Sequence, residues 1–306
     1  MALTRRCGQV ARPKAIADLE SALRLYDAAL KLCPDDQPLA RARIEARKGT
    51  ALQAVPSSAA ENLEAALDCF ERAKPYLQQE GSAEELAELE MNLGLVLQSW
   101  AGIRRAKITD AIAAYQRSLR TFNKKAHPKE FSILQNNLAT AFLSIPLTDE
   151  RAKMREAMAV QAFEEGLRVV DIVNHPSEYA MLQNNLGNAL QYASSSHSVE
   201  NNIRALAAYD EALKVRTRTT TPLEYANTIA NKANCLLNLA DDPERPEDGN
   251  AHNAAKAREL YQEAQAIFLE RGETDKADVV AEALKDIGSA LNGWQPQSKA
   301  RNGVGE

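Results

Sequence analysis

Four histidines and four cysteines are the residues of this chain best suited to acid–base, nucleophilic or metal-binding chemistry. A catalytic or metal site needs several such groups at a spacing that brings them together. The cysteines lie far apart with no CxxC pair, so the sequence predicts neither a zinc site nor a disulfide framework. They are Cys7, Cys33, Cys69 and Cys235. We expect reduced thiols in a cytoplasmic protein.

The histidines follow a structural pattern rather than a catalytic one. His127 and His175 occupy the same position of a repeat, directly before a proline, and a shared role at a helix start explains this duplication better than catalysis does. The carboxylate pair Asp241-Asp242 reads as turn residues. The chain has no phosphate-binding loop, dinucleotide fingerprint, HExxH or GxSxG motif. We therefore expect no enzyme activity, no cofactor and no metal.

Two motifs alternate along the chain, and both have the three- and four-residue spacing of amphipathic helices. The first reads HPKEFSILQNNLATAF from His127 and HPSEYAMLQNNLGNAL from His175, with a third copy, TPLEYANTIANKANCL, from Thr221. A proline and then a glutamate open each copy. This is typical of a helix N-terminus. The backbone N–H that proline lacks would have no partner within the helix there, and a carboxylate faces the positive end of the helix dipole.

The second motif places one aromatic residue among alanines, and these aromatics follow one another at spacings of 44, 45, 48, 46 and 52 residues. They are Tyr26, Phe70, Tyr115, Phe163, Tyr209 and Tyr261. A period of this length predicts stacked supersecondary units, none of which can bury its apolar faces alone. The sequence therefore predicts an array of helix pairs.

We predict one continuous all-α domain over residues 1–292, followed by a flexible C-terminal tail over residues 293–306. A helix near 15–32 precedes the pairs, and a helix near 274–292 follows them. The pairs are predicted at 38–54/58–79, 83–100/108–123, 128–143/150–173, 176–193/199–217 and 222–240/251–271.

A helix carrying Leu-Gly, as at Leu93-Gly94 and Leu186-Gly187, is followed by a helix of the form Ala-x-x-x-Tyr/Phe-x-x-Ala. This pairing resembles the tetratricopeptide repeat, in an expanded form similar to that of many bacterial arrays. The period is 44–52 residues here and about 34 in that family. The resemblance implies a right-handed α-α superhelix of antiparallel helix pairs. In it the small residue lets paired helices cross closely, and the aromatic fills the gap to the next pair.

The resemblance also implies that the first helix of each pair lines a concave groove. Asparagine is a mediocre helix former, so a column of amides on these helices needs another explanation. An amide has two donors and an acceptor and can bond the main chain of a bound peptide. Alternatively, the amides bond neighbouring helices or backbone carbonyls and fix the repeat spacing. The predicted groove residues are Asn92, Asn136, Asn137, Asn184, Asn185, Asn188, Gln191, Tyr192, Asn227, Asn231 and Asn234.

The net charge of −5 and the pI of about 5.6 leave no basic excess for a phosphate backbone, so we expect no nucleic-acid partner. No stretch approaches 18 consecutive apolar residues, so we expect no membrane span. The acidic cluster of Glu80, Glu84, Glu85, Glu88 and Glu90 reads as a solvated face or, alternatively, as a docking patch.

These observations predict a non-enzymatic scaffold or adaptor that binds a partner protein or peptide in its concave groove. Cations of this face occur only towards its ends, at Arg43, Arg47 and Lys285. A neutral-to-basic internal segment therefore fits better than an acidic C-terminal tail. The alternative is a regulatory subunit that modulates a partner enzyme or transcription factor in trans. An exposed end repeat would also allow a homo-oligomer.

Overall fold

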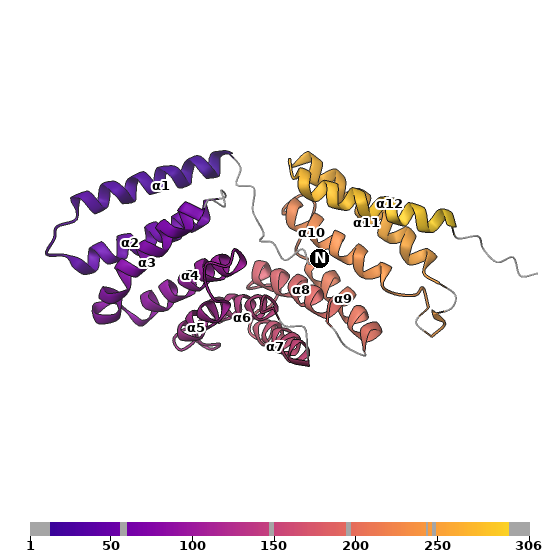
Figure 1. Ribbon diagram of the computed structural model, residues 1–306, viewed down its shortest axis with the longest axis horizontal. Helices are drawn as coiled ribbons and strands as arrows, with labels where there is room; N and C mark the ends of the chain where they lie inside the picture. The colour runs from indigo at the N-terminus through magenta and orange to yellow at the C-terminus, as the bar shows by residue number, and fades with distance from the viewer. Residues whose placement is uncertain are drawn as a thin grey trace, which may run out of the picture. The chain divides into compact units, whose positions relative to one another are not determined.

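The computed structural model describes residues 13–55, 60–146, 150–193, 197–242, 244–246 and 249–293. These residues form twelve α-helices and no strand, which confirms the all-α prediction (Figure 1). Helices that follow one another in the chain pack as sequential antiparallel pairs, as in a helical repeat. The helices are α1 (Pro13–Leu32), α2 (Pro38–Ala54), α3 (Ala60–Glu80), α4 (Ala83–Gly102), α5 (Ile108–Ser118), α6 (Pro128–Leu143), α7 (Glu150–Leu167), α8 (Pro176–Gln191), α9 (Ser198–Leu213), α10 (Pro222–Leu237), α11 (Ala251–Glu270) and α12 (Thr274–Gly293).

The helices divide between two compact units, Met1–Ser195 (unit 1) and Ser196–Glu306 (unit 2). Unit 1 holds α1 to α8 and unit 2 holds α9 to α12. The two helices of the pair predicted over residues 176–217 thus belong to different units, and one continuous domain stays a prediction. The flexible tail predicted over 293–306 lies, from residue 294 onwards, outside the described residues.

The first helices of pairs begin with N-terminal signals, and the prolines predicted at Pro128, Pro176 and Pro222 are among them. Four first helices of pairs begin with proline in the first turn, at Pro38, Pro128, Pro176 and Pro222. The remaining first helix within a pair, α4, begins with a capping box. The Ser82 side chain accepts from the Glu85 N–H, and the Glu85 side chain accepts from the Ser82 N–H. Both devices leave fewer backbone donors unsatisfied at the helix start.

Three second helices end earlier than predicted, at Ser118, Leu167 and Leu213 instead of near 123, 173 and 217. After each of these helices the backbone continues with hydrogen bonds between residues only three positions apart, for example from the Val215 N–H to the Ala212 carbonyl at 3.2 Å. A side-chain oxygen then accepts backbone N–H groups two or three residues later and closes a turn. These turn residues are Asn123, Asp171 and Thr217, at one position of the repeat.

The loop before α11 has a similar device. The carboxylate of Asp241 accepts the N–H groups of His252 and Asn253 at 2.8 and 2.7 Å. Asp241 is therefore a turn residue, as predicted, and in addition it caps the N-terminus of α11, where backbone donors have no partner within the helix.

Two of the repeated aromatics pack against a glycine of their own helix pair. A Cβ at Gly49 of α2 would lie 2.7 Å from the ring of Phe70 on α3, and a Cβ at Gly94 of α4 would lie 2.6 Å from Cδ1 of Tyr115 on α5. Both rings are fully buried. The glycine therefore lets the ring lie against the helix backbone of its own pair. That the aromatic also fills the gap to the next pair stays a prediction, and Phe70 does lie beside Leu89 of α4 in the next pair.

Candidate protein-binding face

The first helices of successive pairs lie side by side in unit 1. Contacts join α2 to α4, α4 to α6 and α6 to α8. We call the surface that these four helices form the first-helix face. Side chains from several repeats can act together on this face, because each first helix is next to the one before it.

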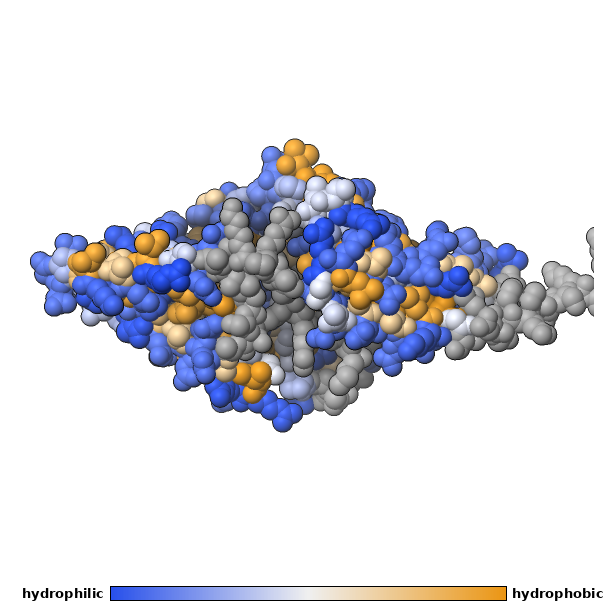
Figure 2. Space-filling view, turned by 90° about the horizontal axis from the view of Figure 1, so that it is seen from above, coloured by the Kyte–Doolittle hydropathy of each residue, from blue (hydrophilic) through white to orange (hydrophobic). Residues whose placement is uncertain are grey.

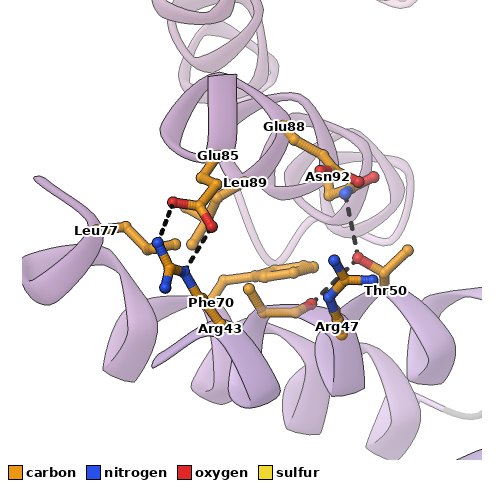
Figure 3. Close-up of a pocket in the computed structure, with 10 residues that line it drawn as sticks. Arg43, Arg47, Thr50, Phe70, Leu77, Glu85, Glu88, Leu89 and Asn92 are labelled. Atoms are coloured by element: carbon orange, nitrogen blue, oxygen red, sulfur yellow. Dashed lines mark hydrogen bonds and ion pairs between the residues drawn. The ribbon is translucent and has the colours of Figure 1, made fainter. Parts of the chain in front are cut away.

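A hollow of about 50 Å³ lies on the first-helix face where α2 and α4 meet α3 (Figure 3). Phe70, Leu77 and Leu89 form its apolar floor and are almost fully buried. Polar side chains surround this floor. The polar residues that line the hollow are Arg43, Arg47, Thr50, Glu85, Glu88 and Asn92.

Two charges of the hollow are paired with each other. The Arg43 guanidinium donates to both carboxylate oxygens of Glu85, at 2.6 and 3.2 Å (Figure 3). This hydrogen bond, more than any other contact, lowers the pKa of Glu85 below its ordinary value, and the Ser82 N–H adds to the effect. Burial opposes the shift but is outweighed. Arg43 and Glu85 therefore hold α2 and α4 together.

The other two charges are differently placed. Arg47 on α2 and Glu88 on α4 are both exposed, and neither makes an ion pair with another residue of the described chain. In Figure 3 they extend from opposite helices at the same end of the hollow as Asn92. This leaves one unpaired cation and one unpaired anion beside an apolar floor.

Asn92 bridges the two helices of the hollow. Its Nδ2 donates to Thr50 Oγ1 at 3.1 Å, and the Thr50 hydroxyl donates to the Ala46 carbonyl at 3.1 Å. Asn92 is buried, whereas Thr50 is exposed at the rim. The predicted groove residue Asn92 therefore lies at the hollow and already bonds a neighbouring first helix.

Four further predicted residues form a relay of amides between α8 and α6. Asn184 donates to Asn185 at 3.1 Å, Asn185 donates to Asn136 at 2.7 Å, and Asn136 donates to Asn137 at 3.3 Å. The relay ends at Asn137, whose Nδ2 is buried with no acceptor among the described residues. These contacts support the interpretation in which the amides fix repeat spacing. Binding of a peptide by the same amides stays a prediction.

The remaining predicted residues lie at the end of α8 and on α10. Asn188 is half-buried, Gln191 is buried, and Tyr192 is 52% exposed directly after α8. In unit 2, Asn231 and Asn234 are half-buried on α10. Asn227 is also half-buried, and its Nδ2 donates to the Leu223 carbonyl of its own helix at 2.7 Å.

The acidic cluster does not form one continuous patch. Glu90 is only 3% exposed and accepts from Lys74 of α3 and Arg117 of α5, both at 2.7 Å. Burial alone would raise the pKa of Glu90, but the hydrogen bonds from Arg117 and Lys74 together lower it below the ordinary value. Glu90 therefore joins three helices and is not part of a docking surface.

Two charged pairs that join the helices of a pair were not predicted from the sequence. Arg72 donates to Glu45 at 3.2 and 3.0 Å in the pair α2/α3, and Arg117 donates to Glu90 in the pair α4/α5. Both pairs join residues 27 positions apart, one repeat from each other. A search for oppositely charged residues that recur at the repeat period could have found them.

The described residues contain no group of three or more histidine, cysteine or carboxylate side chains that could hold a metal ion. Within the same residues, no helix has both the length and the hydrophobicity that a bilayer-spanning segment requires. Two cysteines are buried, and burial raises the pKa of both Cys69 and Cys235 to about 12.

Comparison of the chain with protein-family models and with curated proteins found no match. What the sequence and the structure show together is an all-α protein whose twelve described helices pack as sequential antiparallel pairs, in the manner of a helical repeat.

Proposed function

We propose that this chain is a non-enzymatic scaffold of the tetratricopeptide type that binds a partner protein or peptide along the first-helix face of unit 1. The observation that carries the proposal is the hollow between α2 and α4, where exposed Arg47 and Glu88 stand beside an apolar floor.

The dimensions of the hollow suit a small side chain of a partner. A volume of about 50 Å³ exceeds the roughly 10–15 Å³ that one water needs on the same kind of measure. A short apolar side chain would displace such water and contact Phe70, Leu77 and Leu89. This matches protein interfaces in general, where an apolar anchor fills a pocket and polar groups surround it.

The rim would orient the partner. Thr50 and Asn92 can bond a peptide main chain, and Arg47 and Glu88 offer one charge of each sign. Opposite charges on a rim add specificity and speed association more than they add affinity. Arg43 is already paired with Glu85, so this rim lacks the cluster of cations that would select a C-terminal carboxylate. An internal segment of a partner therefore fits best.

Affinity capture from source-cell lysate tests the proposal. The baits are wild type, a face variant with Arg47→Glu and Glu88→Lys, and a control variant with Glu71→Lys and Arg120→Glu. The face variant breaks no described side-chain contact. The control makes the same charge changes on exposed residues of α3 and of the turn after α5. Circular dichroism establishes that all three baits are folded.

The proposal predicts that wild type and the control capture the same partner and that the face variant loses it. Titration calorimetry with the purified partner should then give weaker binding for the face variant alone. Equal binding by the face variant and wild type would place the binding surface elsewhere and contradict the proposal.

A further inference from the structure

The first helix of the described chain, α1, occupies the place of a second helix in a pair. Its Tyr26 stands where the other pairs carry Phe70 or Tyr115. Asp27, directly after Tyr26, forms an ion pair with Lys48 of α2. The same contact recurs in unit 2, where Asp210 directly follows Tyr209 on α9 and pairs with Lys232 of α10. The helix that would pair with α1 from the other side is not among the described residues.

The face of α1 that would contact this helix is open. In the repeat register, Leu25 of α1 corresponds to Cys69 of α3 and Ala114 of α5. Leu25 is 71% exposed, whereas Cys69 is 1% and Ala114 is 0% exposed. Tyr26 is half-buried, whereas Phe70 and Tyr115 are fully buried. Figure 2 shows hydrophobic surface over α1, at the left of the view.

The last described helix, α12, has the sequence of a first helix, and no described second helix follows it. Its sequence DIGSAL at Asp286 matches NLGNAL at Asn185, so α12 has the pattern of a first helix, with Gly288 as its small residue. Val280 and Ile287 of α12 are buried in the core of unit 2. Beside this buried face of the helix, a Cβ at Gly288 would meet no atom of the described residues within 4 Å.

These two open faces are complementary. In α2/α3 and α4/α5, an aromatic ring of the second helix lies directly on a glycine of the first helix. Gly288 has the position of such a glycine, but no described aromatic ring lies against it. Tyr26 has the position of such a ring, but no described first helix places a glycine against it. We propose that α12 of one copy of this chain pairs with α1 of a second copy and completes a helix pair between them.

Such a contact joins two different surfaces, so each copy keeps one free end of each kind. A heterologous contact of this type closes into a ring or continues into an open chain of copies. Association should therefore proceed beyond the dimer as concentration rises.

Sedimentation velocity over a wide concentration range tests the proposal with two blocked variants. Leu25→Asp places a charge on the open face of α1, and Gly288→Arg fills the open face of α12. Met154→Asp is the control, because it removes an equally exposed apolar side chain, 68% exposed, from α7. Circular dichroism establishes that each variant is folded.

Wild type and the control should form assemblies larger than a dimer, and each blocked variant alone should stay monomeric. An equimolar mixture of the two blocked variants should form dimers and nothing larger. The Leu25→Asp variant keeps only its α12 face and the Gly288→Arg variant keeps only its α1 face, so each molecule can make one contact. A wild type that stays monomeric at every concentration would overturn the proposal. So would a Gly288→Arg variant that still dimerises alone, because α1 would then pair with α1.

Discussion

At Gly49 and Gly94 the backbone of a first helix lies against an aromatic ring of its partner helix. Glycine normally weakens a helix by about 0.5–1 kcal/mol relative to alanine. Its presence at this position is explained by the ring, which leaves no room for a methyl group. The small residue of the repeat is thus a packing requirement and not a weakness of the helix.

Gly94→Ala should therefore destabilise the protein, by about 1–3 kcal/mol for an overpacked site. Gly288→Ala is the matched comparison, since a Cβ there would have no described atom within 4 Å. That change should instead raise stability by about 0.5–1 kcal/mol while it weakens association of copies. Urea denaturation at a concentration where the monomer dominates checks both signs. Equal effects of the two substitutions would contradict the assigned role of the ring.

Glu90 gives a prediction about pH. Its folded-state pKa is lowered, so the stabilisation it provides is present at neutral pH and is lost as the pH falls from about 4.3, the ordinary value, through the folded pKa. Glu90→Gln should cost roughly 2 kcal/mol at pH 7, below the usual range for a broken buried pair because Lys74 and Arg117 are partly exposed. Urea melts at several pH values should show this difference shrinking in acid. A constant difference would contradict it.

Thiol reactivity follows from burial. Cys69 and Cys235 are buried, and their pKa values of about 12 leave almost no thiolate at neutral pH. Cys33 is half-buried. Labelling with iodoacetamide followed by peptide mass spectrometry should modify Cys33 in the native protein, and Cys69 and Cys235 only after denaturation. Rapid native labelling of Cys69 or Cys235 would show that their helix pairs open readily.

At the scale of elements, the turns between pairs repeat as faithfully as the helices. Asn123, Asp171 and Thr217 each close the same turn, and each also accepts a backbone hydrogen bond from the residue four positions later at 3.0 Å. The proline that starts the next helix follows directly. The side-chain oxygen thus sets where one helix ends and the next begins.

Asn123→Ala removes the acceptor of two N–H groups, those of Lys125 and Ala126. It should destabilise unit 1 by about 1 kcal/mol, the usual net value of a hydrogen bond. Lys124→Ala in the same turn is the control, because Lys124 is exposed and makes no described side-chain contact. Thermal melts that give both variants the same midpoint would show that the turn contributes little.

The starts of the first helices of pairs could be predicted from the sequence, because a proline or a serine marks each of them with a local signal. Three helix ends could not, because they depend on one turn residue whose side chain competes with the helix for backbone N–H groups. The amides show a second limit. The sequence placed Asn136 and Asn185 on neighbouring first helices, but only coordinates show that they bond each other.

At the scale of the whole molecule, we propose two kinds of interaction surface on this helical-repeat protein. The first-helix face of unit 1 has a small hollow with two unpaired charges. The open faces of α1 and α12 have a ring and a glycine that match. Partner binding and self-association would therefore use different residues, and a variant that abolishes one should leave the other intact.

Hydrogen–deuterium exchange of the chain, measured with and without saturating captured partner, tests whether the partner binds the first-helix face. We expect the partner to slow exchange in α2 and α4, at the hollow, and to leave the second helices α5 and α7 unchanged. Protection confined to α5, α7 or unit 2 would contradict binding on the first-helix face.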